Sequence, residues 1–74
     1  MNKQEEAFEA RKEHIITKIK NQIPWVDIKE YSHNIITLWL GALETEYGLD
    51  EVKKLIRETR LKYLGWGWVL ETPT

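Results

Sequence analysis

The sequence predicts a small all-α domain of three helices followed by a short aromatic C-terminal tail. Turn-forming residues at Pro24, Gly48 and Gly65 divide the 74 residues into three intervals long enough for helices. Within each interval, apolar residues recur three or four positions apart, the spacing of one helix face. The chain has no cysteine, so no disulfide framework favours another fold. We therefore expect a single domain over 1–74, with helices at 3–22, 28–47 and 51–64 and a tail at 65–74.

The first predicted helix, 3–22, has a start signal, an apolar face and a stop signal. Asn2 and Glu5 have the spacing of a capping box, in which two side chains satisfy the free amides of a helix start. Pro24 ends the helix because it moves the preceding residue out of the α region. The apolar residues of one face are Phe8, Ile15, Ile16, Ile19 and Ile23.

The central predicted helix, 28–47, is apolar around more than half of its circumference. Asp27 and Glu30 repeat the capping box, and Val26 and Tyr31 have the spacing of a hydrophobic staple. Two apolar stripes lie side by side, and the second consists of Ile36, Leu40, Leu43 and Tyr47. A chain this short has little surface with which to cover two stripes. We therefore expect a homodimer that buries the second stripe between copies.

The third predicted helix, 51–64, follows a short connection in which Gly48 takes a left-handed conformation and Asp50 caps the helix. Gly65 ends it, and Leu61 and Trp66 have the spacing of the apolar contact in a Schellman ending. Large apolar residues then alternate at 66, 68 and 70. The tail is therefore expected to lie extended, to fold back on the helices, or to pair as a short strand.

Composition and charge exclude several classes of function. A formal net charge of −1 gives no global field that attracts phosphates or anionic lipid. The longest uncharged run, 32–43, is too short for a membrane span, and the acidic start differs from a signal peptide, so a cytoplasmic protein is expected. No nucleophile has a recognisable base and orienting residue, and no glycine-rich loop is present to bind phosphate. We expect neither an enzyme nor a cofactor.

A metal site is also not expected. Glu30 and His33 have the E-x-x-H spacing that holds metal in di-iron bundles. Such a site needs a second copy of the motif, and the remaining histidine, His14, lies on the polar side of the first helix. Solvated side chains are the simpler interpretation.

Two kinds of macromolecular contact remain. In the first, a protein partner binds the end of the third helix and the tail, where interface-type residues gather; these are Arg57, Arg60, Trp66 and Trp68. The competing interpretation is that the tryptophans complete the core. In the second, the third helix resembles the recognition helix of a helix-turn-helix and binds nucleic acid through Lys53, Lys54, Arg57 and Arg60. Asp50 and Glu51 oppose that hypothesis, because they lie at the end that would enter the groove of DNA.

The sequence thus favours a non-catalytic protein–protein interaction module of the adaptor or inhibitor type. Small, mildly acidic helical chains of this kind are typical of inhibitors from phages or mobile elements. The alternative is a small helix-turn-helix-like nucleic-acid-binding regulator.

Overall fold

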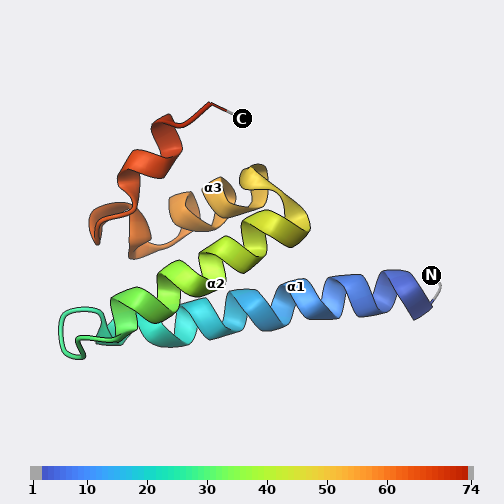
Figure 1. Ribbon diagram of the computed structural model, residues 1–74, viewed down its shortest axis with the longest axis horizontal. Helices are drawn as coiled ribbons and strands as arrows, with labels where there is room; N and C mark the ends of the chain where they lie inside the picture. The colour runs from blue at the N-terminus through green and yellow to red at the C-terminus, as the bar shows by residue number, and fades with distance from the viewer. Residues whose placement is uncertain (1–2, 74) are drawn as a thin grey trace.

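The computed structural model describes residues 3–73 as an all-α domain, which confirms the predicted fold class. The three α-helices are α1 (Lys3–Gln22), α2 (Ser32–Tyr47) and α3 (Leu49–Glu58). Three short 3-10 helices are η1 (Ile23–Trp25), η2 (Arg60–Tyr63) and η3 (Gly67–Glu71). In Figure 1, α2 lies between α1 and α3, and the tail continues beyond α3 on the side away from α1. No strand occurs within 3–73.

Helix α1 has the predicted bounds and buries the predicted face only in its second half. Ile15 and Ile19 are fully buried, whereas Phe8 is 52% exposed. The ring of Phe8 packs on that of Tyr47 at the end of α2, at 4.5 Å between centroids, and the first turns of α1 extend past the end of α2 in Figure 1. The predicted cap, Asn2, lies outside the described residues.

Helix α2 begins at Ser32, so the predicted start at residue 28 is wrong. Asp27 lies in a turn rather than at a helix start, and Tyr31 occupies the N-cap position without a side-chain hydrogen bond. The buried hydroxyl of Ser32 donates to Oε1 of Gln22 at 3.0 Å, which ties the start of α2 to the end of α1. This tertiary contact fixes where α2 begins. A capping motif, which involves only neighbouring residues, could not reveal it.

Helix α3 begins at Leu49 with Gly48 as its N-cap, so the predicted start at residue 51 and the predicted cap, Asp50, are wrong. It ends at Glu58, six residues before the predicted end, because Thr59 adopts an extended conformation (φ −125°, ψ −179°). The Thr59 hydroxyl donates to the carbonyl of Leu55 at 2.8 Å and accepts the amide of Leu61 at 3.3 Å. It therefore closes α3 and opens η2. The break rotates the residues that follow, so Leu61 is fully buried while Tyr63 is 79% exposed. An unbroken helix would have placed Tyr63 in the apolar stripe and Leu61 outside it.

The tail folds back as η3 rather than lying extended or forming a strand. Gly65 has the left-handed φ of 122° expected of it, and the Trp66 amide donates to the Leu61 carbonyl at 3.2 Å, the bond of the predicted Schellman ending. Trp66 and Val69 are 4% and 8% exposed. Their spacing of three residues is that of a 3-10 helix, so the alternation at 66, 68 and 70 was misleading.

The second apolar stripe of α2 is covered by the chain itself. Ile36 and Leu43 are fully buried, Leu40 is 6% exposed, and Tyr47 is half-buried. Helices α1 and α3 pack on α2, and Leu61, Trp66 and Val69 of η2 and the tail join the same core. The expectation that these four residues require a second copy of the chain was therefore based on a wrong premise.

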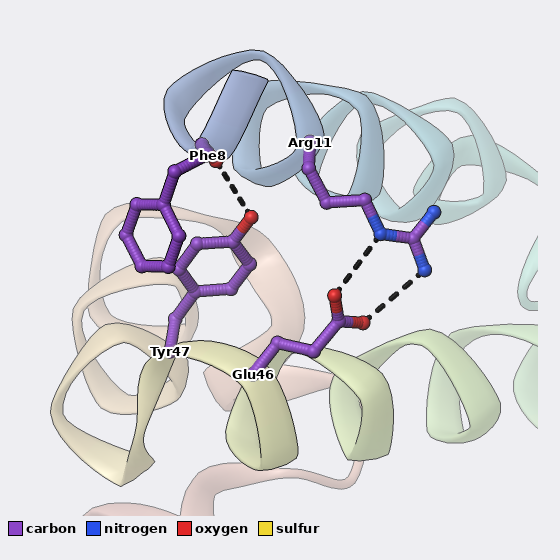
Figure 2. Close-up of polar contacts among 4 residues, drawn as sticks. All are labelled: Phe8, Arg11, Glu46 and Tyr47. Carbon is purple, nitrogen blue, oxygen red and sulfur yellow. Dashed lines mark hydrogen bonds and ion pairs between the residues drawn. The ribbon is translucent and has the colours of Figure 1, made fainter. Parts of the chain in front are cut away.

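Side chains of α1 and α2 bridge the end where the two helices diverge, as Figure 2 shows. Arg11 donates from Nε and Nη2 to the two carboxylate oxygens of Glu46 at 3.1 and 3.2 Å, and the Tyr47 hydroxyl donates to the Phe8 carbonyl at 2.6 Å. The hydrogen bonds from Arg11 lower the pKa of Glu46, and burial raises the pKa of Tyr47. Tyr47 thus holds α1 against α2.

Candidate functional site

The candidate site is an apolar groove of about 250 Å³ between α2, α3 and the tail, which we call the tail groove. It is lined by Thr37, Gly41 and Glu44 of α2, by Leu49 of α3, and by Trp66 and Trp68 of the tail, among others. The Schellman ending at Gly65 aims η3 back toward α2, and η3 forms one wall of the groove.

The two tail tryptophans have different roles, although the sequence grouped them. Trp66 is 4% exposed and stacks on the ring of His33 at 4.2 Å between centroids, with 22° between the ring planes. It anchors the tail to α2. Trp68, 66% exposed, lines the tail groove with much of its indole in solvent. Only Trp68 is therefore free to contact a partner without unfolding the tail.

Arg57 and Arg60 are exposed, but they do not line the tail groove. The break at Thr59 separates them between α3 and η2. The two arginines therefore do not share the tail groove with Trp68, although the sequence grouped them with it.

Two of the five basic residues of the third-helix region, Lys53 and Lys62, are engaged within the chain. The Lys53 ammonium donates to the Thr72 carbonyl and so holds the end of the tail. The Lys62 ammonium donates to the Arg57 carbonyl at 3.2 Å, at the last turn of α3. Lys54 lines a second hollow, of about 190 Å³ between α1 and α3, whose charged residues are Lys12, Glu13, Lys20, Glu51, Lys54 and Glu58. Of the four residues predicted to bind nucleic acid, Lys53 is therefore engaged with the tail, whereas Lys54, Arg57 and Arg60 are exposed.

His33 takes part in tail packing through its ring contact with Trp66. Within residues 3–73, no group of three or more His, Asp or Glu side chains is arranged to hold a metal ion. Ser32, the sole serine, is buried with its hydroxyl on Gln22, so it is not placed to act as a nucleophile.

Gly41 is the groove residue that sequence reasoning missed. It lies in the middle of α2, and a Cβ atom built there would meet nothing within 4 Å. A glycine inside a helix costs about 0.5–1 kcal/mol relative to alanine, so an isolated glycine in an apolar helical pattern is itself a signal. It marks a place where another backbone or side chain can approach the helix.

None of the helices within the described residues is long and apolar enough to cross a bilayer. Comparison of the chain with protein-family models, with curated proteins and with solved structures found no match.

Proposed function

We propose that this chain is a non-catalytic protein-interaction module of the adaptor or inhibitor type that contacts its partner through the tail groove. The observation that carries the proposal is Trp68, which is 66% exposed beside an apolar groove. Tryptophan supplies a large share of the binding energy at protein interfaces, where it becomes buried in desolvated pockets near the centre of the contact. The lack of cysteine supports a reducing compartment, and we propose the cytoplasm.

The size of the groove favours a protein partner over a small molecule. Its volume of about 250 Å³ is below the roughly 300–1,000 Å³ of typical ligand pockets. One side of the groove is open to solvent at Gly41 and Trp68. A protruding side chain of another protein suits such a shallow site better than an enclosed metabolite does.

The experiment is affinity capture from the native host with the full chain, in wild-type form and as Trp68→Ala. A specific partner protein should be retained by the wild type and lost with Trp68→Ala. Leu38→Ala is the matched control, because Leu38 is an equally exposed apolar residue (72%) outside the groove lining.

Two results would contradict the proposal. Retention of the partner by Trp68→Ala would show that the tail groove is not the contact surface. Release of the captured material by nuclease, together with its loss in Arg57→Glu/Arg60→Glu, would support the nucleic-acid alternative instead.

A further inference from the structure

We infer that the tail groove accepts a basic amphipathic segment of the partner, which inserts an apolar side chain beside Gly41 and presents lysine or arginine to Glu44 and Asp50. This inference rests on the proposed function and adds the chemistry of the partner to it.

The apolar part of the inference comes from the floor and wall of the groove. Leu40 and Val52 line it and are only 6% and 4% exposed, so their outer surface forms the floor. Trp68 provides an exposed aromatic wall, and the space above Gly41 is open. An incoming Leu, Ile or Phe side chain would cover these surfaces and gain the free energy of apolar burial.

The charged part comes from an unusual run of sequence. Between Lys29 and Lys53 there is no lysine or arginine, and four carboxylates gather around the turn from α2 to α3. Two of these are paired, Glu46 with Arg11 at 3.1 Å and Glu51 with Lys12 at 3.7 Å.

The other two carboxylates belong to Glu44, which lines the groove, and Asp50, which follows the lining residue Leu49. Both are exposed, and no ion pair within residues 3–73 uses either one. Lys53 brings one positive charge to the tail, where its ammonium donates to the Thr72 carbonyl, and Glu71 precedes Thr72 in the sequence. The turn end of the groove is therefore acidic, which complements a basic partner and repels phosphate.

A second copy of this chain fits the groove poorly. Its own basic helix, α3, has its apolar residues Val52, Leu55 and Ile56 buried in the core. Helix α1 likewise buries Ile15 and Ile19. A folded copy therefore cannot offer basic and apolar side chains together from α3, and the exposed Phe8 of α1 lies in its acidic first turns. An exposed amphipathic helix of another protein can offer both.

The test uses two synthetic amphipathic helical peptides of equal length, one built from leucine and lysine and the other from leucine and glutamate. Each is titrated into the isotopically labelled full chain and followed by NMR. The leucine–lysine peptide should shift the amide signal of Gly41 and the indole signal of Trp68 saturably. The leucine–glutamate peptide should bind at least roughly tenfold more weakly, because like charges meet at the turn.

Three variants sharpen the test. Gly41→Leu fills the groove from a position with free space and should abolish peptide binding without lowering the thermal midpoint. The double variant Glu44→Gln/Asp50→Asn should weaken binding of the leucine–lysine peptide roughly two- to tenfold, the effect of removing two exposed charge pairs. Leu38→Ala should bind like the wild type.

Several outcomes would overturn the inference. These are equal binding of both peptides, no binding of either, or shifts that gather on the acidic first turns of α1 instead of the groove. Light scattering that shows a dimer for the wild type and a monomer for Gly41→Leu would identify a second copy as the occupant. If the peptides fail but Trp68→Ala still loses its captured partner, the interaction function stands and only the basic partner is wrong.

Discussion

The two sides of α2 are closed in different ways. Toward α1, side chains bridge the helices at both ends, through Ser32 on Gln22 at one end and Glu46 on Arg11 at the other. Toward the tail, one ring stack holds η3 to α2, and Gly41 leaves open space beside it. The same helix thus supports a sealed interface and an exposed groove. The difference shows that the groove forms because Gly41 has no side chain and the tail is short, and not because apolar residues are lacking.

The largest expected effect tests whether the tail belongs to the core. Trp66→Ala should lower the free energy of unfolding by about 3–5 kcal/mol, because it removes a buried aromatic side chain. Trp68→Ala should change it by no more than about 0.5 kcal/mol, since most of that side chain is exposed. Urea denaturation followed by circular dichroism measures both. Similar losses for the two variants would mean that the tail groove is not open as described.

The sealed side is tested by Ser32→Ala. Loss of the buried hydrogen bond to Gln22 should destabilise the chain by about 1 kcal/mol and loosen the start of α2. Thr45→Ala, an exposed change on the same helix, is the control and should be close to neutral. Hydrogen exchange at the first turn of α2 provides a local readout. Unchanged protection there would show that the contact between Ser32 and Gln22 does not fix the helix start.

The open side is tested by a substitution that should stabilise the protein. Gly41→Ala should raise the free energy of unfolding by about 0.5–1 kcal/mol, because alanine favours the helix and meets no neighbour there. The same change at Gly65 should have the opposite sign, since its φ of 122° is unfavourable for a residue with a Cβ atom. Thermal unfolding distinguishes the two, and a loss of stability in Gly41→Ala would indicate that the groove is already filled.

The smallest expected effect is a pH-dependent one at the ion pair of α1 and α2. Hydrogen bonds from Arg11 lower the folded-state pKa of Glu46 below its ordinary value of 4.5. The stabilisation is therefore present above that value and is lost as the pH falls through the lower folded-state pKa. Wild type should be slightly more stable than Glu46→Gln at about pH 7, and the two should converge as the pH falls below the folded-state pKa of Glu46. Both side chains are partly exposed, so added salt should reduce the difference.

Local signals predicted several elements correctly because their causes lie within a few residues. The bounds of α1 follow from the apolar period and Pro24, and the Schellman bond from Trp66 to Leu61 follows from Gly65. The predicted bounds failed where a distant or competing contact intervened. Ser32 bonds to Gln22 ten residues away, and the hydroxyl of Thr59 ends α3 although the apolar period continues.

The candidate site was predicted only in part. Trp68 was named from its residue type, but the sequence could not separate it from Trp66. The folding of η3 decides that Trp66 is buried in the core and that Trp68 stays exposed. Arg57 and Arg60 were grouped with the tryptophans because they are close in the sequence. In the structure the helix breaks at Thr59, and neither arginine lines the tail groove.

The sequence by itself determined the all-α class, the three-helix order and the acidic stretch between Lys29 and Lys53, because residue period, turn chemistry and charge are local properties. Tertiary structure alone decided how the second stripe of α2 is covered and where the groove opens. The stripe is covered because α1 and α3 pack on α2, and the groove opens where the tail folds back after Thr59, with Leu61, Trp66 and Val69 in the same core. This packing within one chain buries Ile36, Leu40 and Leu43, which a second copy of the chain was expected to cover.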